Sequence, residues 1–152
     1  MLTEKQREYI RNADRRWNIK TGAARSGKTY CDFFVIPMRI RKAGEGTILF
    51  LGCTAGTFER NVLAPMRELR GEEAVGRPSN DGEVEVFGRI CNIIGASRGD
   101  GAEKLQGTGV AYAYGDEITT WDREVFDMLK SRLDKRGACF DGTCNPAGPT
   151  HW

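Results

Sequence analysis

Short apolar runs alternate along the chain with longer stretches in which apolar residues recur at helical spacing. The runs predict strands, because a buried parallel strand is apolar on both of its faces; they cover residues 16–21, 47–52, 110–117 and 138–146. The longer stretches predict helices; they cover residues 3–14, 28–42, 56–71 and 121–133. The alternation predicts a three-layer α/β protein, with a mostly parallel sheet between two layers of helices.

Polar residues and prolines refine the ends of these elements. Thr3 and Thr120 are suited to cap the first and the last helix. Pro37 and Pro65 lie inside the second and third predicted helices, and each is expected to kink or interrupt its helix. A β-hairpin is predicted around residues 83–95, with Gly88-Arg89 as its two-residue turn.

The totals exclude several classes of protein. The 152 residues suffice for one domain, and 23 Lys and Arg against 21 Asp and Glu leave a net charge of +2, which excludes a histone-like polycation. No apolar run reaches 18 residues, and the charged N-terminus does not resemble a secretory signal, so no membrane association is expected. Five scattered cysteines with no C-x-x-C pair, and a single histidine next to the last residue, predict reduced thiols in a cytosolic protein without a zinc site.

The chemistry begins with the sequence G-x-x-x-x-G-K-T between a predicted strand and a predicted helix. In that context, backbone N–H groups and the helix dipole converge on one spot and favour a phosphate. Lys28 is expected on the β- and γ-phosphates, and the Thr29 hydroxyl on Mg²⁺. The predicted ATP-binding loop consists of Gly22, Ala23, Ala24, Arg25, Ser26, Gly27, Lys28 and Thr29.

Two acids follow the predicted strand over 110–117. Asp116 is suited to hold Mg²⁺ together with Thr29, and Glu117 to orient and deprotonate an attacking water. Acids at the end of a strand also serve as caps for a following helix, and the pair gains its catalytic meaning from the glycine loop.

Thr143 and Asn145 end the last predicted strand. Ligands of open α/β sheets bind at the carboxyl ends of the strands, so both side chains are candidates for contact with the γ-phosphate or the water. On these residues alone, a simple Asn-Pro turn is the other interpretation.

Taken together, the stretches "LTEKQREYI", "TGAARSGKT", "KLQGTGVAYAYGDEIT" and "GTCNPAGPTHW" resemble the ATPase domain of tailed-phage terminase large subunits, the motors that package viral DNA. The resemblance runs through nearly the whole chain. It implies that Gln6 reads adenine, that Arg25 senses the γ-phosphate, and that Asp116 and Glu117 form the Walker B pair. It also implies that Thr143 and Asn145 couple hydrolysis to movement.

The resemblance further implies an order of strands: the strand ending near Thr143 should lie between those ending at Thr21 and Asp116. One position departs from the family, because Gln106 stands where many relatives carry an arginine that reaches into a neighbouring subunit. Lys104 and Arg98 are the candidates to replace that arginine.

The expected whole is one P-loop ATPase domain over residues 1–152, incomplete at its C-terminal end and without the nuclease domain of the family, so no nuclease activity is expected. The resemblance implies a phage or prophage protein in the bacterial cytoplasm that works on double-stranded DNA. Its implied partners are a small terminase subunit and a portal, with a homo-oligomeric ring on the portal and a monomer in isolation. Two other functions stay open: a non-catalytic nucleotide-binding or interaction module, and another P-loop ATPase that remodels DNA.

Overall fold

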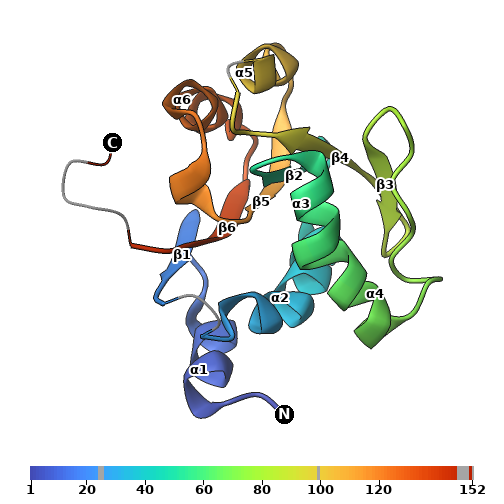
Figure 1. Cartoon of the computed structure of the whole chain (residues 1–152), viewed down its shortest axis with the longest axis vertical. Coiled ribbons are helices and arrows are strands. Elements are labelled where there is room, and N and C mark those ends of the chain that lie inside the picture. The colour runs from blue at the N-terminus through green and yellow to red at the C-terminus, as the bar shows by residue number, and fades with distance from the viewer. Residues whose placement is uncertain (24–25, 99, 147–150, 152) are drawn as a thin grey trace.

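A computed structural model describes residues 1–23, 26–98, 100–146 and 151 of the chain. A six-stranded sheet in the order β1-β6-β5-β2-β4-β3 forms its centre (Figure 1). The strands are β1 (Trp17–Thr21), β2 (Thr47–Gly52), β3 (Glu83–Val86), β4 (Arg89–Gly95), β5 (Val110–Gly115) and β6 (Cys139–Cys144). All neighbouring pairs are parallel except β3 and β4, which form an antiparallel hairpin at one edge.

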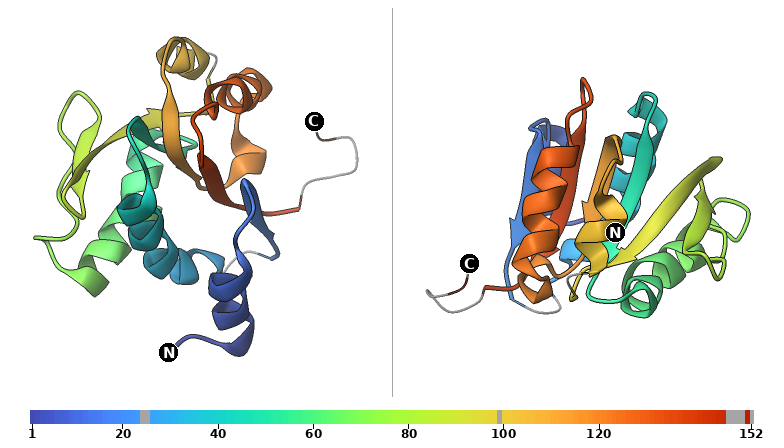
Figure 2. Two further views of the ribbon diagram at one scale, coloured as in Figure 1. Left: turned by 180° about the vertical axis from the view of Figure 1, so that it is seen from behind. Right: turned by 90° about the horizontal axis from the view of Figure 1, so that it is seen from above.

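Helices cover both faces of this sheet, as Figure 2 shows in its right-hand view, where α6 and α2 lie on opposite sides of the strands. The helical elements are α1 (Glu4–Asn12), α2 (Lys28–Lys42), α3 (Ala55–Phe58), the π-helical turn η1 (Glu59–Leu63), α4 (Ala64–Arg70), α5 (Asp100–Leu105), the 3₁₀ turn η2 (Ile118–Thr120) and α6 (Arg123–Arg132). The three-layer α/β fold is therefore confirmed.

Two apolar cores fill the space between the layers. On one face, α2 and the α3–η1–α4 segment pack on the sheet through side chains such as Ile36, Phe50 and Met66. On the other face, α5 and α6 pack on it through side chains such as Leu105 and Leu129. The central strands β2 and β5 contribute to both cores, which explains their continuous apolar runs.

The first helix differs from the rest, because none of its residues is buried. Thr3 caps it as predicted, in a capping box with Gln6. The helix lies beside α2, at the end of the molecule that carries the N-terminus (Figure 1). No helix among the described residues is long and apolar enough to cross a membrane.

The predicted order of strands is confirmed, since β6 lies between β1 and β5. Thr21 pairs with Cys144, and Gly115 pairs with Gly142, so the loop after β1, the acids after β5 and the end of β6 meet at one edge.

Two local predictions were wrong. The hairpin turn is Phe87-Gly88, not Gly88-Arg89: Val86 pairs with Arg89, and both turn residues have positive φ, 50° and 80°, as a type I′ turn requires. Asp122, not Thr120, caps α6, because its side chain accepts from the Glu124 N–H while Thr120 belongs to η2.

Neither predicted proline breaks its helical segment. The α2 helix continues through Pro37, and the helical segment of residues 55–70 continues through Pro65 behind a widened π turn.

Candidate ATP-binding site

The glycine loop joins β1 to α2, as its sequence predicted. Gly27 stands immediately before α2 with φ of 76°, a left-handed conformation that a residue with a Cβ adopts only at a cost. A Cβ there would also lie 3.0 Å from Nε2 of Gln6. Ala24 and Arg25, both predicted to bind the nucleotide, lie outside the described residues.

The Lys28 ammonium lies inside the loop and connects it to the end of β6. It donates to the carbonyl oxygens of Gly22 and Ala23, each at 2.7 Å, and to Oδ1 of Asn145 at 3.0 Å. A positive charge is thereby held where the loop and the start of α2 favour a phosphate. Two predicted site residues that are 117 positions apart in the chain are thus in direct contact.

Asp116 follows β5 and is nearly buried, with 5% of its surface exposed. Its Oδ1 accepts from the Thr143 hydroxyl at 3.0 Å, and its Oδ2 accepts from the amide of Asn61 at 3.3 Å. Burial raises the pKa of this carboxyl above its ordinary value of 3.8, and the two hydrogen bonds oppose that rise. Thr143 therefore supports the predicted metal-binding acid directly.

Glu117 has an unusual backbone conformation for a residue with a side chain, with φ of 50° and ψ of 54°. Its N–H donates to the Thr143 hydroxyl at 3.2 Å, and its carbonyl accepts from the Thr120 hydroxyl at 2.7 Å. The indole N–H of Trp121 holds the preceding carbonyl, that of Asp116, at 3.0 Å. Strained conformations of this kind persist where their surroundings enforce them, and they concentrate at functional sites.

A cleft of about 630 Å³ brings most of the predicted residues together. Eight residues that the sequence predicted for the site line this cleft: Ser26, Gly27, Lys28, Thr29, Asp116, Glu117, Thr143 and Asn145. The sequence analysis missed five more, which are Tyr30, Arg60, Asn61, Pro65 and Cys144. Arg60 and Asn61 come from the π turn η1, and nothing in their spacing distinguished them from surface residues of an ordinary helix.

Gln6 lines a second hollow, of about 680 Å³, together with Gly22 and Lys28. Its Nε2 donates to the carbonyl of Gly27 at 2.8 Å, and its Oε1 accepts from the backbone N–H of Thr3 at 2.8 Å. This amide therefore ties α1 to the phosphate loop. Its role in reading adenine stays a prediction.

A buried ionic network lies beneath the loop, and no pattern in the sequence pointed to it. Lys20 pairs with Asp32 at 2.5 Å, and the Tyr114 hydroxyl donates to the same carboxylate at 2.7 Å. Burial raises the pKa of Asp32 to about 6, against the opposing effect of Lys20 and Tyr114. Asp32 is three residues beyond Thr29 in α2, so the network stiffens the segment that carries the predicted metal-binding hydroxyl.

A second ion pair with a buried carboxylate holds β6. Arg39 donates to both carboxylate oxygens of Asp141, at 2.8 and 3.2 Å, and the Tyr9 hydroxyl approaches the same group at 3.4 Å. Asp141 is two residues before Thr143 on the strand. The strand that ends in Thr143 is therefore fixed to α2 by an ion pair and to α1 by a weaker contact.

The metal prediction rests on hard oxygen donors. Among the described residues, no three His, Cys, Asp or Glu side chains gather into a metal site of their own. Thr29 and Asp116 both line the cleft, and a hydroxyl and a carboxylate fit Mg²⁺, which usually takes one or two protein oxygens and completes its shell with waters and substrate phosphates. The five cysteines form no disulfide.

Comparison with solved structures decides the fold. The large terminase from a thermophilic bacteriophage, in complex with ADP, superimposes with a TM-score of 0.84 at 23% identity, over 99% of this chain and 40% of that chain. The chain has the fold of the ATPase region of phage large terminases. The same terminase in complex with ATP-gamma-S gives a TM-score of 0.79 at 22% identity, over 100% of this chain and 40% of that chain.

The ATPase domain of the Thermus phage P74-26 large terminase has the same terminase fold with more divergence, with a TM-score of 0.56 at 15% identity over 97% of this chain and 67% of that domain. This chain spans about 40% of the length of the nucleotide-bound terminase chains. No protein-family model matches the sequence, and no curated protein matches it either.

The candidates for a trans-acting cation are all exposed and none of them lines the cleft. Lys104 lies in the last turn of α5, 3.8 Å from Asp100 of the same helix; Gln106 follows the helix, and Arg98 precedes it. A residue that acts on a neighbouring subunit must face outward, so their role stays a prediction.

Proposed function

We propose that this chain is an ATP-hydrolysing motor domain of the terminase large-subunit type. One observation carries the proposal: residues that follow three different strands line one cleft. They are Lys28 and Thr29 at the start of α2, Asp116 and Glu117 after β5, and Asn145 after β6. The terminase fold supports it, as do the structures of the thermophilic phage's terminase in complex with ADP and ATP-gamma-S.

In the proposed mechanism, the loop after β1 holds the phosphates of ATP, with Lys28 on the β- and γ-phosphates, and Arg25 senses the γ-phosphate, as the resemblance to terminases implies. Thr29 and Asp116 would hold Mg²⁺, which would supply positive charge against the charge that develops on the phosphates. Glu117 orients water for in-line attack and accepts its proton.

Thr143 is the centre of this arrangement, because its one hydroxyl bonds both to Asp116 and to the backbone of Glu117. Asn145 bonds to Lys28. A change at the γ-phosphate is therefore proposed to reach β6 through Thr143 and Asn145, and from β6 to pass to the rest of the motor. Translocation of double-stranded DNA, a ring of copies, and contacts with a portal and a small subunit are proposed from the resemblance to terminases.

The first test is calorimetric titration of Mg·ATP into the wild-type chain and into Lys28→Ala. We expect wild type to bind and Lys28→Ala to lose binding, because Lys28 carries the positive charge held in the loop. A folded wild-type chain that does not bind would contradict the proposal for this polypeptide and favour the interaction module.

The second test separates binding from turnover. Glu117→Gln keeps the shape of the side chain and removes the base, so we expect ATP affinity to stay and hydrolysis to fall by a factor of about 10² to 10⁴. Retained turnover in this variant would remove Glu117 from the role of base. DNA-stimulated hydrolysis without strand separation would distinguish a packaging motor from a helicase-like remodelling ATPase.

A further inference from the structure

The helical segment of residues 55–70 widens at η1 (Glu59–Leu63), where the N–H of Ala64 bonds to the carbonyl of Glu59, five residues earlier. Pro65 follows directly. In an unbroken α-helix its ring would press on the carbonyl of Asn61, and a π turn relieves such a clash by adding one residue to the turn. π turns inside helices occur frequently at functional sites.

The widened turn directs two consecutive side chains into the cleft. Asn61 donates to Oδ2 of Asp116 at 3.3 Å, and Arg60 lines the same cleft. Because Asn61 is bonded to the predicted metal-binding acid, the turn that carries the neighbouring Arg60 is held against Asp116.

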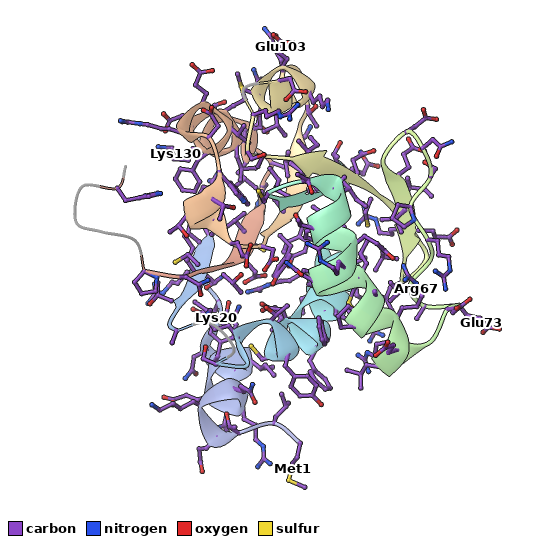
Figure 3. The ribbon with its side chains drawn as sticks, viewed as in Figure 1. Met1, Lys20, Arg67, Glu73, Glu103 and Lys130 are labelled. Atoms are coloured by element: carbon purple, nitrogen blue, oxygen red, sulfur yellow. The ribbon has the colours of Figure 1, made fainter. Side chains whose placement is uncertain are left out.

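The turn is anchored on its other side by Arg67, which is 6% exposed. Its guanidinium makes two bonds to Glu59, of 2.8 and 3.2 Å, and two to the carbonyls of Val75 and Gly76. Figure 3 shows Arg67 between α4 and the segment that leads to β3. The first residue of the π turn is therefore clamped, which limits how far the turn can move away from the cleft.

Arg60 differs from Arg67 because none of the described residues pairs with its charge. It is exposed, and no other described residue forms an ion pair or a side-chain hydrogen bond with it. Among the described residues, the charged side chains that line the cleft are Lys28 and Arg60 against Asp116 and Glu117. Without Arg60, the described part of the cleft would present two carboxylates and one ammonium to a strongly anionic ligand.

The two cationic side chains, Lys28 and Arg60, are held by different parts of the protein. Lys28 is bonded within the loop, to Gly22 and Ala23, while Arg60 stands on the turn that bonds to Asp116. We propose that Arg60 binds the terminal phosphate of ATP from within the same chain. This inference rests on the proposed ATPase function. An arginine suits this role because its planar fork donates two hydrogen bonds to a phosphate.

The test uses titrations of Mg·ATP and Mg·ADP into the full chain. A group on the terminal phosphate contributes to ATP affinity and hardly to ADP affinity, since ADP lacks that phosphate. For Arg60→Ala we expect ATP affinity to fall by about tenfold to a hundredfold, the range of a lost charge-assisted hydrogen bond, and ADP affinity to change by less than about twofold.

The matched control is Arg123→Ala. Arg123 is 70% exposed and begins α6, on the other face of the sheet, so its removal should change neither affinity. The urea midpoints of both variants should equal that of wild type, because neither arginine is buried.

The outcomes separate the two proposals. If wild type binds ATP and Arg60→Ala binds it equally well, or loses ATP and ADP affinity together, the role of Arg60 is overturned while the ATPase proposal stands. If folded wild type does not bind ATP, both are overturned.

Discussion

Thr143 offers the most direct test of how the site is built. Its hydroxyl donates to Asp116 and accepts from the Glu117 N–H, and the residue is 2% exposed. Thr143→Val keeps the shape of the side chain and removes both bonds. The variant leaves a buried carboxylate oxygen and a backbone N–H without their partner.

The expected loss follows from these two groups. A hydrogen bond to a charged group contributes about 1.5–3 kcal/mol, and an unsatisfied buried N–H costs about 1–3 kcal/mol. Because one hydroxyl serves both and the site relaxes in part, we expect Thr143→Val to lower the free energy of unfolding by about 2–4 kcal/mol. With a urea slope of about 2 kcal/mol/M, the midpoint should fall by about 1–2 M.

The assay is urea unfolding followed by tryptophan fluorescence, with Thr143→Ser as the matched control, because serine keeps the hydroxyl. The loss in Thr143→Val should also shrink as Asp116 becomes protonated, since the bond stabilises the ionised carboxylate. The reasoning is refuted if valine costs less than about 0.5 kcal/mol, or if serine costs as much as valine.

Burial and backbone conformation lead to three further predictions. Burial raises the pKa of Asp32 from 3.8 in the unfolded chain to about 6 in the folded protein. The contribution of Asp32 to the free energy of unfolding is therefore greatest below about pH 4, and it is lost as the pH rises through 6 and the buried carboxyl ionises. A shift of about 2 pKa units corresponds to about 3 kcal/mol, so the free energy of unfolding of wild type should fall by that amount between pH 4 and pH 6, relative to Asp32→Asn. Urea titrations at several pH values measure this difference, and a difference that stays constant with pH would contradict the prediction. Gly88→Ala should cost about 1–2 kcal/mol, because φ is +80° there although the space is open, while Gly44→Ala, also in open space, should be nearly neutral; equal midpoints would disprove the backbone argument. Gly115→Ala should cost about 1–3 kcal/mol or more, because its Cβ would overlap the indole of Trp121, and a thermal midpoint equal to wild type would show that the ring can move.

The sequence was sufficient for those parts of the site that the backbone itself dictates. A loop that curls around phosphates needs glycine at fixed positions, and an acid after an apolar strand marks the carboxyl edge of a sheet, so the loop and Asp116 were predictable. The position of β6 between β1 and β5 came from the family resemblance and is confirmed.

Other parts depend on contacts between distant segments. Asp32 has the spacing of a helix residue, and only the fold shows that it is buried against Lys20 and Tyr114. The π turn adds a residue to a helix whose apolar spacing is otherwise ordinary, so the placement of Arg60 in the cleft could not be derived. The hairpin turn was misplaced by one residue because glycine suits either central position of a two-residue turn, depending on its type.

The first helix has a consequence for the dynamics of the molecule. With no buried residue, α1 is held by polar contacts, from Gln6 to Gly27, from Tyr9 to Asp141 and from Arg39 to the carbonyl of Ala13. Segments with few apolar contacts open at a small fraction of the global free energy of unfolding. The amide protons of α1 should therefore exchange with solvent whenever this helix alone detaches. The amide protons of β5 and β6 should exchange only when the whole molecule unfolds. Because Gln6 links α1 to the phosphate loop, each detachment also releases one of the loop's fixed points.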